Sequence, residues 1–301
     1  MNRSFLTRYI WLSIAAAIAT ILLKTGAWYL TDSIGLLSAA IESVINLLAA
    51  LMAMAMLKIA ILLPDKNHKY GHHKAEYFSS LLEGILIMVA AAGIAYTAGE
   101  RFLNPRPIEK LGIGLIVSLI ATAINFTVAR ILLSAGKKYR SITLEADSHH
   151  LMTDVWTSVA VIGGVGAVGL TGWLKLDSLV AIAVAINILR TAFIIIKRSI
   201  AGLMDTSLSQ QEQDTIESVL SIYRLQGIQF HALLTRQAAS RRFVSIHVLV
   251  PGNMQVHDAH HIAENIEKDI RHVLGDTVVF THIEPMDDVI SLDDIDLDRP
   301  S

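Results

Sequence analysis

The sequence has no cysteine, and this absence excludes disulfide bonds, thiolate metal sites and cysteine nucleophiles. Charged residues are also scarce, at 17% of 301 residues, whereas ordinary soluble domains have about 25%. The net charge of −2 gives no electrostatic support for a nucleic-acid partner. Because 53% of the residues are hydrophobic, the composition predicts a protein embedded in a lipid bilayer.

Six apolar segments can each supply the roughly 20 residues that a membrane-spanning helix needs. They are 9–30, 34–63, 77–102, 111–133, 144–170 and 174–196. Ten lysine and arginine residues flank these segments on one side of the membrane and four on the other. This bias predicts that both termini lie in the cytoplasm. We therefore expect an all-α, six-helix transmembrane domain over residues 1–205, located in the cell inner (plasma) membrane.

The chain after residue 205 has the character of a soluble, cytoplasmic domain. Ser209 and Glu212 form a capping-box pattern at the start of a helix. The strand and helix patterns that follow lie at 228–236, 243–250, 256–274 and 277–283. This αββαβ order predicts a small α+β domain of the ferredoxin-like kind over 206–286. Residues 287–301 are rich in aspartate, and we expect a disordered acidic tail there.

The twelve histidines lie in three places: between the second and third apolar segments, at the start of the fifth, and in the C-terminal domain. Under the predicted orientation, all of them lie in the cytoplasm or in the cytoplasmic half of the membrane. Neutral imidazole is the commonest metal ligand in proteins. This distribution favours a protein that handles metal ions.

The first candidate metal site lies within the membrane. Glu42 and Asn46 are four residues apart in the second segment and share one helix face. His150 and Asp154 share a face of the fifth segment in the same way. Together the two faces could offer one nitrogen and three oxygens to a divalent ion. Ionisable groups at membrane depth indicate function, although a polar contact between two helices without metal is the alternative. Asp147 could face a cytoplasmic vestibule.

A second candidate site lies in the loop before the third segment. One metal ion could be bound there by Asp65, His68 and His72, because the loop is short and Gly71 permits a tight turn. The alternative is a solvated basic loop without a metal. Spacing alone does not separate these two interpretations.

The third candidate site belongs to the C-terminal domain. His231 and His247 lie on adjacent predicted strands, and the apolar neighbours of His247 predict that its side chain points away from the domain core. His260 lies on the following helix, while His282 and Glu284 end the last strand. These residues exceed what one zinc ion requires, so a site for two ions is possible.

Two motifs, taken with the six segments, resemble those of the cation diffusion facilitators, and in particular their bacterial zinc and ferrous-iron efflux branch. They are Asp65-x-x-His68-x-Tyr-Gly-His72-x-Lys74-Ala-Glu76 and Glu145-Ala-Asp-Ser-x-His150-x-x-x-Asp154. The resemblance covers roughly residues 8–285. It implies a homodimer, not an enzyme, that exports divalent metal ions in exchange for protons.

The resemblance also assigns roles to the three groups of residues. It implies that the first group is the transport site, that the second binds an ion at the loop, and that the third binds two ions in the cytoplasm. Divalent ions such as zinc, iron(II) or manganese would then be both the substrate and a ligand of the cytoplasmic domain.

This sequence departs from the family pattern at three positions. Glu42 and Asn46 stand where the zinc and iron exporters have two aspartates, and Glu284 replaces another aspartate. Asn46 cannot take a proton, so these changes bear on the metal and on the proton stoichiometry. Oxygen-rich ligation favours manganese or ferrous iron, while the single histidine is compatible with zinc. An intramembrane metalloenzyme and a metal sensor without transport are the alternative functions.

Overall fold

The computed structural model describes residues 4–31, 34–104, 112–173 and 175–292. The chain forms two compact units, one over residues 2–200 and the other over residues 201–301.

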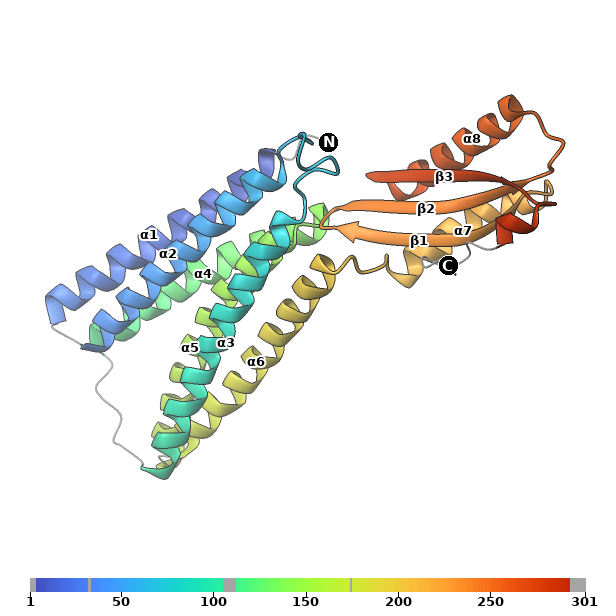
Figure 1. Ribbon diagram of the computed structural model, residues 1–301. Coiled ribbons are helices and arrows are strands. Elements are labelled where there is room, and N and C mark those ends of the chain that lie inside the picture. Colours follow the sequence, from blue (N-terminus) through green and yellow to red (C-terminus); the bar gives the residue numbers. More distant parts are fainter. Residues whose placement is uncertain (1–3, 32–33, 105–111, 174, 293–301) are drawn as a thin grey trace. The chain divides into compact units, whose positions relative to one another are not determined.

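The first unit is helical, with six long helices among its described residues (Figure 1). After the 3-10 turn η1 (Ser4–Leu6) they are α1 (Thr7–Thr31), α2 (Ile34–Ala60), α3 (Ala75–Leu103), α4 (Gly112–Tyr139), α5 (Ile142–Thr171) and α6 (Lys175–Leu203). Within the described ranges, α1, α2, α3, α4 and α6 contain stretches long and apolar enough to cross a membrane. Helix α5 carries Glu145, Asp147 and Asp154 in its first half.

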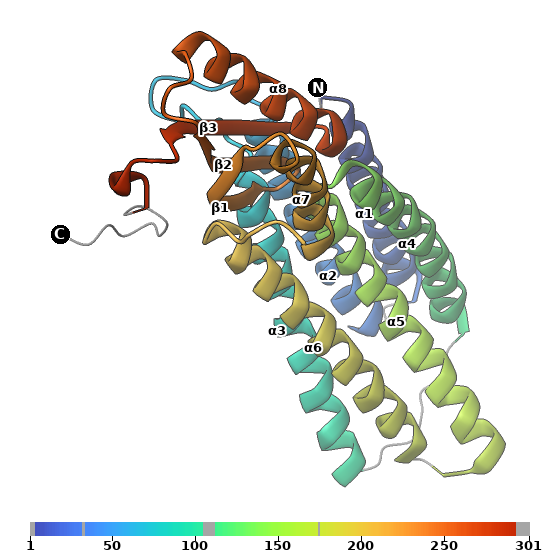
Figure 2. The ribbon, with the colours of Figure 1, turned by 90° about the vertical axis from the view of Figure 1, so that its right-hand side faces the viewer.

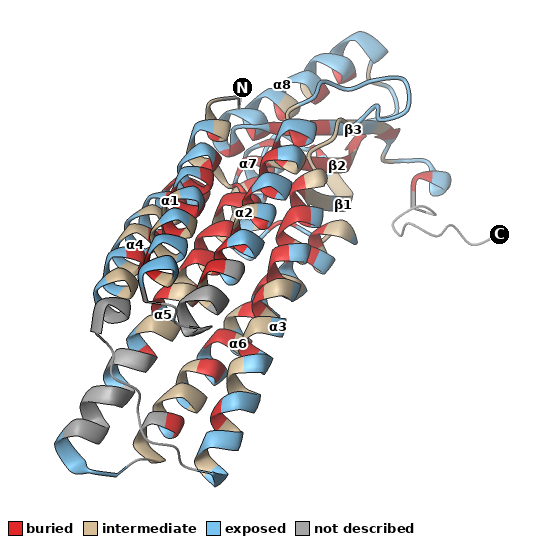
Figure 3. Cartoon of the chain, turned by 90° about the vertical axis from the view of Figure 1, so that its left-hand side faces the viewer, coloured by how far each residue is buried: buried red, intermediate tan, exposed pale blue. Residues whose placement is uncertain are grey.

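Helix α5 contributes to two buried apolar clusters. In the first, Leu144 and Leu151 of α5 pack with residues of α1, α2 and α4. In the second, Ala146 of α5 packs with residues of α3 and α6. Figure 3 shows the buried residues of these helices on the sides that face one another and the exposed residues on the outer sides. The polar first half of α5 is therefore enclosed by neighbouring helices.

Small side chains allow the helices to approach closely. A Cβ atom on Gly136 of α4 would lie 2.9 Å from the backbone nitrogen of Glu145 on α5, and one on Gly84 of α3 would lie 2.8 Å from Ile196 on α6. Beside Gly84, the hydroxyl groups of Ser80 and Ser199 lie 2.7 Å apart and join the same two helices. Close backbone approach through small residues is how membrane helices gain packing contacts.

The second unit has the predicted αββαβ order. Its elements are α7 (Gln210–Arg224), β1 (Gln229–Ala238), β2 (Arg241–Val250), α8 (Val256–Leu274) and β3 (Thr277–Pro285). The predicted capping box is present: the Ser209 hydroxyl accepts the backbone N–H of Glu212, and the Glu212 carboxylate accepts the backbone N–H of Ser209. The sheet order is β1-β2-β3, with β1 antiparallel and β3 parallel to the central strand β2. Figure 2 shows α7 and α8 beside this sheet.

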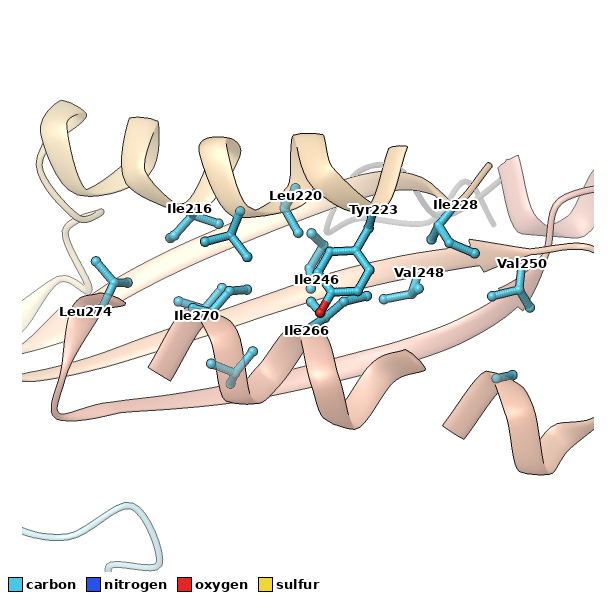
Figure 4. Close-up of a cluster of buried hydrophobic side chains, with 14 of the residues drawn as sticks. Ile216, Leu220, Tyr223, Ile228, Ile246, Val248, Val250, Ile266, Ile270 and Leu274 are labelled. Atoms are coloured by element: carbon cyan, nitrogen blue, oxygen red, sulfur yellow. The ribbon is translucent and has the colours of Figure 1, made fainter. Parts of the chain in front are cut away.

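The core of the second unit lies between the sheet and its two helices. Ile216 and Leu220 of α7 and Ile266 of α8 meet Ile246 and Val248 of β2 (Figure 4). Ile246 and Val248 are fully buried, and because side chains alternate along a strand, His247 lies on the opposite face. The structure thereby confirms the predicted fold class, a helical transmembrane domain followed by a small α+β domain.

The expected acidic tail begins with structured residues. Val289–Leu292 forms the 3-10 helix η2, and the Ser291 hydroxyl donates to the carbonyl oxygen of Pro285 at 2.8 Å. Residues 287–292 are therefore not disordered, because they fold back on the end of β3. The rest of the expected tail, 293–301, lies outside the described residues.

We predict that Gly136→Ala destabilises the protein although alanine is the better helix former. The added methyl group meets the α5 backbone, which cannot rotate away as a side chain can. Overpacking costs about 1–3 kcal/mol, so the melting temperature in detergent should fall by about 2–8 °C. Gly93→Ala is the matched control, because its Cβ meets nothing within 4 Å. Equal melting temperatures for the Gly136 variant and the wild type would contradict the close packing.

Candidate metal sites

The intramembrane site is centred on Asn46 of α2, which lies between two side chains of α5. The Asn46 Nδ2 donates to Asp154 Oδ2 at 2.5 Å, and the Asn46 Oδ1 lies 2.8 Å from His150 Nε2. Asn46 is 6% exposed and His150 is 7% exposed. The predicted contact between these faces of α2 and α5 is therefore present for three of the four residues.

The hydrogen bonds fix the proton position on His150. Since the Asn46 amide uses its nitrogen to donate to Asp154, its Oδ1 is left to accept. The His150 Nε2 must then carry the hydrogen and donate it. The other ring nitrogen, Nδ1, is buried and has no hydrogen-bond partner in the part of the chain that the structure describes. A metal ion binding at Nε2 would have to displace this proton.

Glu42 lies at the edge of this group. It is exposed on α2, and it lies within electrostatic reach of Asp154, His150 and Lys24. Lys24 of α1 donates to the Ser43 hydroxyl at 2.9 Å and to the Ala39 carbonyl oxygen at 3.2 Å. A positive charge thus lies close to the two acidic residues. Lys24 was not among the site residues predicted from the sequence.

Asn125 of α4 is a further site residue that the sequence analysis missed. Its Nδ2 donates to Asp154 Oδ2 at 3.1 Å, and its Oδ1 is buried with no hydrogen-bond partner among the residues that the structure describes. Asp154 is therefore held by amides from two different helices. The available signal was that Asn125 is the one amide side chain in the apolar segment 111–133.

Asp147 does not face a vestibule, as the sequence had suggested. It is 2% exposed, and its Oδ1 accepts a hydrogen bond from the Ser13 hydroxyl of α1 at 3.0 Å. Helix α1 covers this part of α5, so the carboxyl group is enclosed within the helices.

The loop residues Asp65, His68 and His72 also lie together. Their ligand atoms are within 4.8 Å of one another: Asp65 Oδ1 is 3.2 Å from His68 Nδ1, and Asp65 Oδ2 is 3.4 Å from His72 Nε2. Gly71 has a φ of +85°, which permits the turn that brings His72 back toward Asp65. A tetrahedral metal site needs a fourth ligand, which water can supply because the loop is exposed.

The backbone of the loop orients the Asp65 carboxylate. The N–H groups of His68 and Asn67 donate to Asp65 Oδ1 at 2.6 and 2.8 Å. The His68 N–H above all holds the pKa of the Asp65 carboxyl below its usual range. The carboxylate is thus charged and available to a cation near neutral pH.

The cytoplasmic group lies on the sheet face opposite the core. His231, His247 and Glu284 offer ligand atoms within 4.8 Å of one another. The His231 Nε2 lies 2.8 Å from Glu284 Oε2 and 3.1 Å from His247 Nδ1. The strand register explains why these residues meet. His231 pairs with His247 across β1 and β2, and His247 pairs with His282 of β3, two residues before Glu284.

Two other predicted residues of this domain have different positions. The His282 Nε2 lies 3.4 Å from Glu284 Oε1, and the His282 side chain is 62% exposed. His260 is exposed on α8, with its ring 6.0 Å from that of His261. His260 is therefore not among the residues that the structure brings together on the strands.

Sequence profiles of two known domains cover most of the chain. The cation efflux transmembrane domain matches residues 10–204, and the cytoplasmic domain of cation efflux proteins matches residues 208–286. The chain belongs to the cation efflux family. It is therefore a multi-pass membrane protein and a metal efflux transporter rather than an enzyme, which confirms the resemblance to the cation diffusion facilitators.

Full-length relatives agree with this assignment. An uncharacterized transporter, sll1263, of Synechocystis sp. is 49% identical over 280 residues, or 93% of this chain and 90% of its own length. The cation-efflux pump FieF of Shewanella oneidensis is 30% identical over 91% of this chain and 92% of its own length. The protein of the same name from Klebsiella pneumoniae is 29% identical over 95% of both chains.

We predict that His247→Ala weakens zinc binding by the full-length protein, because it removes one of three converging ligands. The zinc affinity of this cluster should fall by at least about 10–100-fold. Titration calorimetry in detergent measures it. His272→Ala is the control, since His272 is an exposed histidine in the last turn of α8. A His247 variant with unchanged zinc stoichiometry and affinity would refute the assignment of this cluster.

Proposed function

We propose that this protein is a homodimeric antiporter that exports divalent metal ions in exchange for protons by alternating access. It would reside in the cell inner (plasma) membrane with both termini in the cytoplasm. Zinc, iron(II) and manganese are the candidate substrates. The proposed transport ligands are Glu42, Asn46, His150 and Asp154.

The contact of Asn46 with His150 and Asp154 is the observation that carries this proposal. It combines an imidazole, an amide and a carboxylate from α2 and α5 among apolar helices. Each of these groups is a metal ligand in other proteins. Polar groups at this depth are costly unless they serve transport or another function.

Metal binding and proton release would be linked at His150. In the described arrangement the Nε2 atom donates to Asn46, so ligation through Nε2 requires that its proton leaves or moves to Nδ1. The Asn46 amide would also turn its oxygen toward the ion. Metal ligands must be deprotonated to bind, which makes ion loading compete with protons.

The charge of the site bears on which ion it selects. Glu42 and Asp154 supply two carboxyl groups, and Lys24 places one positive charge close to them. Asn125 adds a buried oxygen that has no hydrogen-bond partner within the described ranges. Oxygen-rich ligation favours harder ions such as manganese or ferrous iron, while the imidazole of His150 favours zinc.

The remaining two groups would act on the cytoplasmic side. Asp65, His68 and His72 would capture ions at the loop. In the second unit, the cluster of His231, His247 and Glu284, with His282 beside it, would bind cytoplasmic metal and favour the transport-competent dimer. The match to a cytoplasmic domain of cation efflux proteins supports this role. A metal sensor without transport would bind ions equally well but would show no flux into sealed vesicles.

We predict that Asp154→Asn abolishes transport while the protein folds. The substitution keeps the shape of the side chain but removes the carboxylate that amides of two neighbouring helices contact, so initial rates should fall by at least about 100-fold. The measurement is metal uptake into proteoliposomes across an imposed pH gradient, with zinc, iron(II) and manganese tested separately. Asp258→Asn, an exposed position in the first turn of α8, is the control. Normal flux in the Asp154 variant at normal protein abundance would reject the site.

We predict that Asn46→Asp binds zinc more tightly and makes transport more dependent on pH. The new carboxylate would lie against Asp154, where screening is weak, so the pair would have to hold a cation or a proton. Transport rate against pH and against the three metals distinguishes wild type from variant. Asn104→Asp, at the C-terminal end of α3, is the matched control. Identical pH profiles and metal ranking would place residue 46 outside the coordination shell.

A further inference from the structure

A second pair of buried acidic residues lies in the membrane unit, outside the proposed transport site. Glu83 of α3 and Asp147 of α5 are each 2% exposed, and they lie within electrostatic reach of each other. The Ser79 hydroxyl donates to Glu83 Oε1 at 3.2 Å, and the Ser13 hydroxyl donates to Asp147 Oδ1 at 3.0 Å. Helices α1, α3 and α5 therefore all contribute to this polar group.

Each carboxyl group of the pair has one oxygen that these serines do not reach. Glu83 Oε2 and Asp147 Oδ2 are buried and have no hydrogen-bond partner among the described residues. Two buried carboxylates that lie within electrostatic reach of each other would repel each other. A proton bound to one of the two carboxyl groups removes one negative charge and supplies an O–H donor.

The ionisable groups next along the packed helices are engaged elsewhere. They are Glu76, Glu145, His150 and Arg198. Glu76 accepts a hydrogen bond from Ser141, Glu145 pairs with Arg198 of α6, and His150 contacts Asn46. A cationic side chain is thus not what neutralises Glu83 and Asp147 in the part of the bundle that the structure describes.

The pair is close enough to the transport site to respond to the ion there. Asp147 and His150 are three residues apart on α5, a spacing that makes them neighbours on the helix surface, with Cβ atoms about 5–6 Å apart. An ion bound by His150 and Asp154 brings two positive charges near the pair. In a poorly screened interior this charge favours the ionised carboxylates and weakens their hold on a proton.

We propose that Glu83 and Asp147 share one proton that the protein exchanges for the exported metal ion. When the ion loads, the carboxylic acid O–H bond breaks and the proton passes to water on the cytoplasmic side. When the ion leaves, a proton from the opposite side re-forms that bond. This pair can bind a proton, which the amide of Asn46 cannot do. The inference rests on the antiport proposed above and assigns a proton carrier that is not itself a metal ligand.

The test counts the protons released when zinc binds to the full-length protein in weakly buffered detergent solution, followed with a pH indicator. Glu83→Gln should release about one proton fewer per chain, while the number of bound zinc ions stays the same. Glu83→Asp keeps a titratable group and should restore the count. Glu100→Gln makes the same substitution at the exposed end of α3 and should match the wild type.

A second substitution guards against a folding defect in the Glu83 variant. Asp147→Asn keeps an oxygen that can accept from Ser13, and it should also release about one proton fewer. Unchanged proton counts in folded Glu83→Gln and Asp147→Asn would overturn the inference. Loss of a bound zinc ion in either variant would also overturn it, because the pair would then bind metal itself.

The failure of this inference can be separated from the failure of the antiport. Proton movement driven by a zinc gradient in wild-type proteoliposomes tests the antiport alone. Its absence would overturn both proposals. Its presence, together with unchanged counts in the two variants, would overturn only the shared proton.

Discussion

A carboxylate that lies among apolar helices needs partners, because no water is present to solvate it. In this protein the partners come from other helices. Asp154 accepts from amides of α2 and α4, and Asp147 accepts from a serine of α1. Both acidic residues belong to α5, and so α5 lies against helices on several sides. The contacts that make these charges tolerable also hold the central helix in position.

The fold could be predicted well because it depends on patterns that are local in sequence. The length of the apolar segments predicted the helices of the first unit. The alternating pattern of the strands and the capping box of the first helix predicted the second unit. The predicted helix at 256–274 coincides with α8, because the apolar face containing Ile266 and Ile270 and the glycine that follows at 275 mark its extent. The tail was less predictable, since the turn at 287–292 depends on contact with Pro285 rather than on composition.

The candidate site could be predicted only in part, for a geometric reason. A spacing of four residues shows that Glu42 and Asn46 share a face, but it does not show how that face is rotated toward a neighbouring helix. The structure turns Asn46 to α5 and leaves Glu42 at the edge. The contribution of Asn125 depends on the packing of α4 against α5, and the burial of Asp147 depends on α1. None of these contacts has a signal in local periodicity.

The parallel pairing of β2 with β3 affects how the cytoplasmic cluster comes into existence during folding. His231 and His247 are brought together by a hairpin, but Glu284 joins them only after α8 has crossed over and β3 has taken its place. Contacts between residues distant in sequence form late and at an entropic cost. A chain in which only the hairpin has formed therefore presents two of the ligands together, whereas the finished sheet presents all three. An ion that bound the cluster would stabilise the folded domain over the unfolded chain, and the surrounding metal concentration would then also set the fraction of this domain that is folded.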